Sequence, residues 1–114
     1  MKIITNSRIV PAGYTGITIF PFVFLRYDKK KYGNNRYEII TNHEKIHLQQ
    51  QKELLVVFFY ILYAVHYLRN YVKYKNHNKA YRNIVFEKEA FSNERDNHYL
   101  SKRNRFAFVQ YLKK

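Results

Sequence analysis

Residues 41–55 read TNHEKIHLQQQKELL, and the spacing of the two histidines in this stretch indicates how the chain folds around them. In an α-helix, His43 and His47 lie on the same face because residues four apart are separated by about one turn. The same stripe carries Ile39, Ile40, Ile46, Gln50 and Leu54. The stretch therefore predicts an amphipathic helix whose two imidazoles face the interior.

Two imidazoles one turn apart can chelate a single metal ion, and Glu44 lies directly beside the first of them. In a helix Glu44 projects where it can reach a water on that ion rather than the ion itself. We therefore predict His43 and His47 as metal ligands and Glu44 as a general base. The alternative interpretation is a pair of core histidines satisfied by ordinary hydrogen bonds.

A catalytic zinc ion usually takes three protein ligands, and the acidic segment FEKEAFSNE, residues 86–94, offers the third. On a helix Glu87 shares a stripe with Ile84 and Ala90, whereas Glu89 points the opposite way. We predict Glu87 as the third ligand. The alternative for Glu87 is a solvated charge on a helix face, which is common for glutamate.

Three further polar residues are candidates for supporting roles. Glu94 and His98 lie about two and about three turns beyond Glu87 on the same face, and Gln50 lies on the histidine stripe. Glu94 could hold a ligand histidine in one tautomer by accepting its second ring proton. His98 could donate to the oxyanion of a tetrahedral intermediate, which makes it a catalytic candidate. A surface pair between Glu94 and His98 is the alternative.

HEKIH, followed some forty residues later by EKEA, resembles the gluzincin class of zinc metallopeptidases. That class takes its third ligand from a downstream helix with the pattern E-x-x-A-D or E-x-x-A-N. The resemblance implies that His43, His47 and Glu87 bind one zinc ion per chain and that Glu44 is the base. It also implies hydrolysis of peptide bonds, with the substrate paired as an extra strand along a sheet edge. GITIFPFVFL, residues 16–25, is the candidate edge, and its alternative is a sheet face packed on helices.

Most of the chain is also similar to a group of short, uncharacterised bacterial proteins. The similar segments read HEKIHLQQQ, VVFFYILYAVHYL and YRNIVFEKEA. One position departs from the gluzincin pattern, because Phe91 stands where Asp or Asn normally orients a ligand histidine. Glu94, Asn83 or Gln50 would then have to take over that role.

The distribution of glycine and proline predicts an α+β fold in a single domain over residues 1–114. All three Gly and both Pro lie within the first 33 residues. Residues 1–36 are expected to form strands and turns, as a hairpin or small sheet, with Pro21 at an edge or bulge. Residues 37–114 are expected to be helical and to carry the metal site. The predicted helices are 37–52, 53–74 and 79–103, of which the first two could form one bent helix; together they give a minimal zincin-like core.

The charge of the chain limits its partners. Twenty-one Lys and Arg against 8 Asp and Glu give a formal net charge of +13, which favours contact with anionic surfaces. Without a recognisable nucleic-acid-binding motif, nucleic acid is the less favoured partner, and an anionic membrane is the better candidate. The second hypothesis for function is therefore a non-catalytic basic module that binds membrane or nucleic acid. No Cys is present, so any metal must be held by His and carboxylates.

Location depends on the uncharged run LLVVFFYILYAVHYL, Leu54–Leu68. It is shorter than the roughly 18 apolar residues of a confident membrane span. Two interpretations remain, a buried core helix or a helix inserted in or lying on a membrane. Because the N-terminus lacks a secretory signal pattern, we expect a cytoplasmic protein, with the inner membrane surface as the alternative location.

Overall fold

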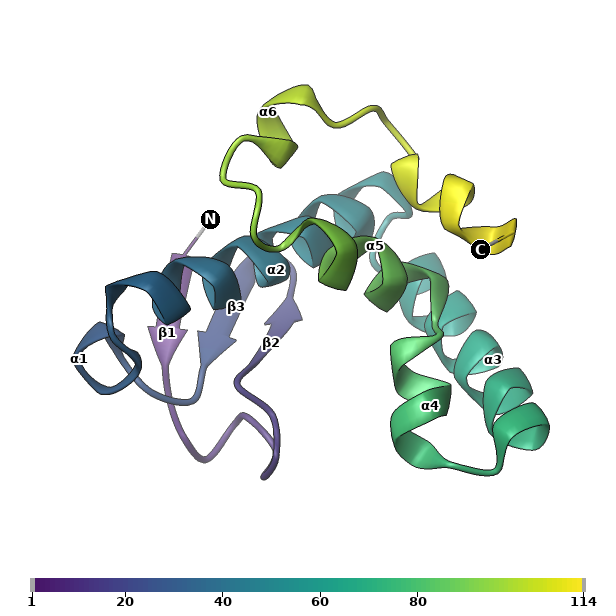
Figure 1. Ribbon diagram of the computed structural model, residues 1–114, viewed down its shortest axis with the longest axis horizontal. Coiled ribbons are helices and arrows are strands. Elements are labelled where there is room, and N and C mark those ends of the chain that lie inside the picture. Colours follow the sequence, from purple (N-terminus) through teal and green to yellow (C-terminus); the bar gives the residue numbers. More distant parts are fainter. Residues whose placement is uncertain (1, 114) are drawn as a thin grey trace.

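The first third of the chain forms a small β-sheet (Figure 1). The computed structural model describes residues 2–113, so the two ends of the predicted 1–114 domain lie outside the described residues. Within this range β1 (Lys2–Thr5), β2 (Gly16–Ile19) and β3 (Phe22–Leu25) form a sheet in the order β1–β3–β2. β2 and β3 are antiparallel, whereas β1 pairs with β3 in parallel. Pro21 lies in the turn between β2 and β3, so the run predicted as one strand is itself a hairpin.

A long helix, α2 (Asn34–Glu53), packs across this sheet. It follows the short α1 (Lys29–Tyr32), whose first turn is capped by the Asp28 carboxylate accepting from the Lys31 N–H. Val23 and Leu25 of β3 pack against Ile40 of α2 in a buried apolar cluster. The predicted amphipathic helix is therefore present, and one part of its buried face rests on the sheet.

The chain breaks sharply between α2 and α3 (Val57–Tyr74), which are bent by 113°. Leu55 and Val56 both adopt positive φ, at 56° and 55°, although neither is glycine. In α3 only Phe59 and Asn70 are buried, so the interpretation of Leu54–Leu68 as a buried core helix is wrong. Among the described residues no single helix is long and apolar enough to span a membrane; α2 and α3 meet that test only together.

The region predicted as one helix over residues 79–103 is divided, and that prediction is wrong. It contains α4 (His77–Arg82), α5 (Val85–Asn93) and α6 (Tyr99–Lys102), followed by the 3₁₀ helix η1 (Ala107–Lys113). α4 ends where the Asn83 side chain donates to the Lys79 carbonyl. α5 ends where the Asn42 amide of α2 donates to the carbonyls of Asn93 and Glu94. These competing hydrogen bonds explain both breaks.

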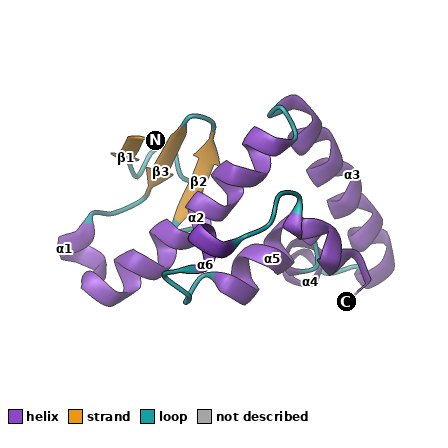
Figure 2. Ribbon diagram, turned by 90° about the horizontal axis from the view of Figure 1, so that it is seen from above, coloured by secondary structure: helices purple, strands orange, loops and turns teal. Residues whose placement is uncertain are grey.

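The second apolar core lies where the helices meet. It consists of the buried residues Phe59, Ile84, Val85, Phe86 and Phe108. Figure 2 shows the sheet along one side of α2 and α5 along the other. The α+β class is confirmed, and α2 is the shared element between the sheet and the remaining helices.

Candidate metal centre

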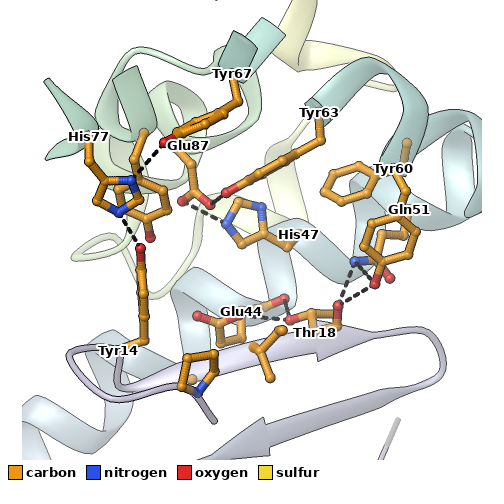
Figure 3. A pocket seen from close by; sticks show the side chains of 15 residues that line it. Tyr14, Thr18, Glu44, His47, Gln51, Tyr60, Tyr63, Tyr67, His77 and Glu87 are labelled. Atoms are coloured by element: carbon orange, nitrogen blue, oxygen red, sulfur yellow. Dashed lines mark hydrogen bonds and ion pairs between the residues drawn. The ribbon is translucent and has the colours of Figure 1, made fainter. Parts of the chain in front are cut away.

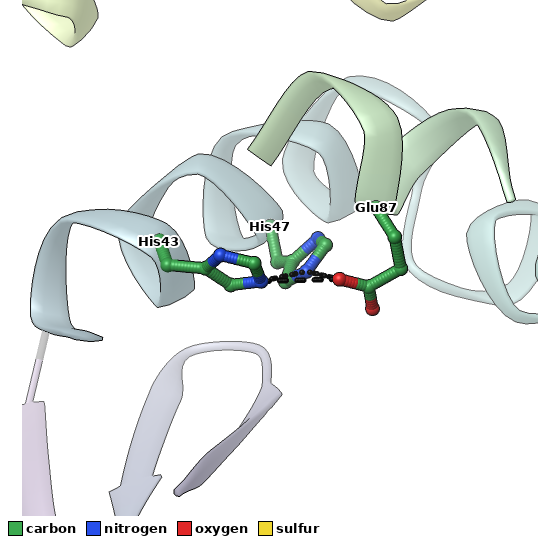
Figure 4. Close-up of side chains that lie close together, drawn as sticks. All are labelled: His43, His47 and Glu87. Atoms are coloured by element: carbon green, nitrogen blue, oxygen red, sulfur yellow. Dashed lines mark hydrogen bonds and ion pairs between the residues drawn. The ribbon is translucent and has the colours of Figure 1, made fainter. Parts of the chain in front are cut away.

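Three predicted ligands meet in the interior between α2 and α5 (Figure 4). His43 and His47 come from successive turns of α2, and Glu87 comes from the first turn of α5. Glu87 Oε1 lies 3.1 Å from His43 Nε2 and 2.9 Å from His47 Nε2, and the two Nε2 atoms are 3.2 Å apart. All three residues are buried. The structure therefore brings together the predicted ligand set.

The other ring nitrogen of each histidine is held by a hydrogen-bond acceptor. His43 Nδ1 lies 2.6 Å from Glu94 Oε1, and His47 Nδ1 lies 2.8 Å from Gln50 Oε1. The Gln50 amide orientation follows from its Nε2, which donates to Glu89 Oε1 and the Phe86 carbonyl. Both Nδ1 atoms must then carry the proton, so in the neutral rings both Nε2 atoms present lone pairs. This is the supporting role predicted for Glu94 and Gln50.

This geometry and donor chemistry fit a divalent cation. Three electron-pair donors converge, and no protein hydrogen lies between them once both rings are neutral. Two ligands at about 2.0–2.1 Å from a tetrahedral zinc ion lie roughly 3.3 Å apart. The observed separations of 2.9–3.2 Å are close to that spacing.

The pKa values of these groups show how strongly they interact with one another. Burial lowers the pKa of His43, but its hydrogen bonds to Glu87 and Glu94 outweigh burial and raise the pKa to about 10. Burial also lowers the pKa of His47, but the charge and hydrogen bond of Glu87, together with the charge of Glu44, outweigh burial and raise the pKa. Burial alone would raise the pKa of Glu87, yet the two histidines hold it below its usual range. The three donors together therefore favour a positive charge between them.

The predicted base, Glu44, is buried beside the ligands and is held from the sheet. The Thr18 hydroxyl of β2 lies 2.9 Å from Glu44 Oε1 and 3.0 Å from its backbone carbonyl, and can donate to either. Burial raises the pKa of Glu44, and the charges of His47 and His43 oppose that increase. Gly16 of β2 also lies close to Glu44. A Cβ at this position would lie 3.2 Å from Glu44 Cγ and 3.1 Å from the Phe24 carbonyl oxygen, so a glycine suits the close approach of the strand.

Two adjoining cavities reach the centre from different sides. Figure 3 shows the first, of about 290 Å³, with Glu44, His47 and Glu87 in a wall otherwise rich in tyrosine. The second, of about 410 Å³, is lined by His43 and also by Glu44. Both cavities share Tyr14, Gly16, Glu44 and Tyr81 in their linings. Glu44 therefore lies where the two cavities meet, next to the edge strand β2.

Sequence reasoning missed two tyrosines at the centre. The Tyr63 hydroxyl of α3 donates to Glu87 Oε2 at 2.7 Å, which leaves Oε1 to face the histidines. Tyr81 of α4 lines both cavities, and burial raises its pKa, so its phenol stays protonated. Tyr63 lies one turn from buried Phe59 on α3, but its contact with Glu87 depends on the bend before α3. Nothing local to Tyr81 marks its position.

Other expectations fare differently. His98 is exposed at the start of α6 and lines neither cavity at the centre, so the structure does not bring it to the ligands. Glu89 was expected to point away from the Glu87 face, and it is fully buried. Its charge is paired with the Arg103 guanidinium, which also binds Glu53.

The departure at Phe91 is compensated by another residue. The ring centroid of Phe91 lies 4.5 Å from that of His43, and Glu94 accepts the hydrogen bond from His43 Nδ1. Asn83 donates to Lys79 instead of a ligand.

The predicted substrate edge is partly occupied. β2 is an edge strand, and its residues Gly16, Ile17 and Thr18 line the first cavity. However, the Thr18 carbonyl accepts hydrogen bonds from the Gln51 amide and the Tyr60 hydroxyl. The Gln51 side chain also accepts from the Phe20 N–H. Only the part of the edge near Gly16 is left to pair with another strand.

Comparisons with protein families, curated proteins and solved structures found nothing that matches this chain. The interpretation of the site therefore depends on its own geometry and chemistry.

Proposed function

We propose that the protein is a zinc-dependent metallopeptidase with His43, His47 and Glu87 as ligands and Glu44 as general base. The observation that carries the proposal is the position of the Glu44 carboxylate. It is buried, it is fixed by Thr18, and it lines the same cavity as His47 and Glu87. A purely structural histidine pair would not require a carboxylate of raised pKa at that point.

A bound zinc ion would supply Lewis acidity, polarising a carbonyl and lowering the pKa of water toward neutrality. The chain supplies the proton transfers. Glu44 accepts a proton from water as the oxygen attacks the peptide carbonyl carbon, and it passes that proton to the nitrogen as the C–N bond breaks. The products are a carboxylic acid and an amine, and Glu44 returns to its starting state.

The remaining residues orient these groups. Glu94 and Gln50 keep both ligand Nε2 atoms unprotonated, and Tyr63 restrains Glu87. Tyr81, protonated and in the wall of both cavities, interacts with the Glu87 carboxylate and would turn from it to donate to the carbonyl oxygen on which charge develops. The substrate class is a peptide or unfolded protein segment, paired with the Gly16 end of β2.

Metal content is the first test. We expect about one zinc ion per chain, measured by elemental analysis of the purified protein, and loss of that zinc in His43→Ala or His47→Ala. The matched control His98→Ala, at an exposed position away from the centre, should keep it. Full zinc content in the His43 and His47 variants would refute the ligand assignment.

Catalysis is tested separately with Glu44→Gln, which keeps the shape of the side chain but removes the base. We expect normal zinc content and loss of cleavage of a fluorogenic peptide library, by at least about a hundredfold. The control is Glu38→Gln, an exposed glutamate on the same helix. Equal cleavage by Glu44→Gln and the parent would remove the base assignment. A protein that binds zinc but cleaves nothing would instead be a metal-stabilised, non-catalytic module.

A further inference from the structure

The outward face of α3 is apolar, which is the reverse of an ordinary amphipathic helix. Seven large apolar side chains lie on one stripe of this face and are between 46% and 74% exposed. They are Val57, Phe58, Ile61, Leu62, Val65, Leu68 and Val72. We call them the α3 apolar stripe. At 1.5 Å per residue α3 is about 27 Å long, and the α3 apolar stripe extends along most of that length.

The inward face of the same helix accounts for its contacts with the protein. Phe59 packs in the core, and Tyr60, Tyr63 and Tyr67 line the first cavity. The protein interior therefore uses the aromatic side of α3 and leaves the aliphatic side uncovered. A contiguous exposed apolar surface of this kind marks an interaction site.

Charge decides between the two simplest partners for this surface. Residues 57–74 contain no Asp or Glu, while Arg69 and Lys73 lie within α3, Lys75 directly follows it and Lys52 lies in the last turn of α2, before the bend. All four are exposed. A second copy of the chain would carry the same net charge of +13 and would be repelled. An anionic phospholipid surface would be attracted instead, and it offers acyl chains to the apolar stripe.

We propose that the α3 apolar stripe docks on an anionic phospholipid bilayer, with the helix lying in the plane of the headgroups. An isolated interfacial helix needs a polar face toward water. In this protein the opposite face of α3 packs on the rest of the molecule, so no such polar face is needed. Because Tyr60, Tyr63 and Tyr67 line the first cavity from the other side of α3, docking holds that cavity close to the bilayer surface. The proposal does not depend on peptidase activity.

Vesicle co-sedimentation tests this proposal with the full chain. Phosphatidylcholine vesicles containing phosphatidylglycerol should bind the protein, and phosphatidylcholine alone should bind it at least about tenfold more weakly. The double variant Ile61→Asn, Val65→Asn should lose about tenfold or more of the binding, because two side chains no longer enter the apolar layer. The matched control, Ile9→Asn with Ile19→Asn, changes two exposed isoleucines outside α3 and should bind normally.

Charge is tested by Arg69→Gln with Lys73→Gln, which should reduce the preference for phosphatidylglycerol while leaving the stripe intact. Zinc content and far-UV circular dichroism verify that each variant is folded. Unchanged binding by the Ile61, Val65 variant would overturn the proposal, because basic residues alone would then explain attachment. A dimer in analytical ultracentrifugation that the same variant dissociates, without lipid binding by the parent, would overturn it in favour of a subunit interface.

Discussion

His43 and His47 differ from ordinary core histidines at the level of single atoms. Each ring donates a hydrogen bond from Nδ1–H, His43 to Glu94 and His47 to Gln50. Each ring directs its Nε2 toward Glu87. A core histidine would normally pair one nitrogen as donor and the other as acceptor with a matching partner. Here the acceptors outnumber the donors, so either a proton or a cation must be bound among them.

Glu94 should control metal affinity without touching the metal. Glu94→Ala removes the carboxylate that holds the Nδ1 proton of His43, so the ring is freer to rotate and less basic. We expect zinc affinity to fall about 10–100-fold, measured by competition with a chromophoric chelator. The control is Glu38→Ala, an exposed glutamate on α2. An unchanged affinity in Glu94→Ala would reduce the Glu94–His43 contact to ordinary packing.

The helical spacing of residues was sufficient to predict the three metal ligands. It was not sufficient to predict the residues that hold Glu44 and Glu87 in place. His43 and His47 are related by one helical turn, and the Glu87 stripe follows the same rule on a second helix. Thr18 and Tyr63 come from elements whose approach to the site depends on the sheet and on the bend before α3. No spacing in the chain encodes such contacts. Buried Glu89 was missed for the same reason, since its partner Arg103 lies beyond α6.

At the scale of elements, the helical pattern predicted which segments are helical better than where they end. The bend before α3 occurs at Leu55 and Val56, with no Gly or Pro to mark it. Ends at Asn83 and Asn93 depend on side-chain hydrogen bonds, of which one crosses from α2. The exposed apolar stripe of α3 also misled the burial prediction, because apolarity alone does not distinguish a core from a docking surface.

The junction of α3 and α5 should make stability depend on pH. His66 Nδ1 accepts the Val85 N–H at 2.9 Å, which requires an unprotonated nitrogen. Burial lowers the pKa of His66 below its ordinary value of 6.5, and the charges of Arg69 and Lys88 lower it further. Between the folded and unfolded pKa values the unfolded chain binds more protons. The stabilising contribution is therefore complete above about pH 6.5 and is lost as the pH falls through the folded pKa.

Urea unfolding at several pH values, with a chelator present, measures this effect. His66→Asn keeps an acceptor for the Val85 N–H but cannot titrate, so its free energy of unfolding should fall less between pH 7 and pH 5 than that of the parent. His98→Asn changes an exposed histidine and should behave like the parent. If the His66→Asn and parent slopes coincide, His66 does not contribute to the pH dependence.

For the whole molecule, the centre joins parts of the chain that are far apart in sequence. α2 contributes both histidines, α5 contributes Glu87, and Tyr63 of α3 holds the other oxygen of that carboxylate. Thr18 of β2 links the sheet to the centre through its hydrogen bond to Glu44. A cation bound at this point would connect the sheet-bearing half of the molecule to the helical half. Its binding free energy would therefore add to the stability of the complete fold.

Zinc should consequently raise the thermal stability of the protein. At free zinc equal to one hundred times the dissociation constant, the gain is about 2.7 kcal/mol if the unfolded chain does not bind. Differential scanning calorimetry with buffered zinc and with chelator measures it. Glu87→Gln should abolish most of the gain, because an amide is a poor zinc ligand, whereas Glu38→Gln at an exposed position should retain it. An equal gain in Glu87→Gln would place the stabilising zinc at another site, and the centre between α2 and α5 would lose its assignment as the metal site.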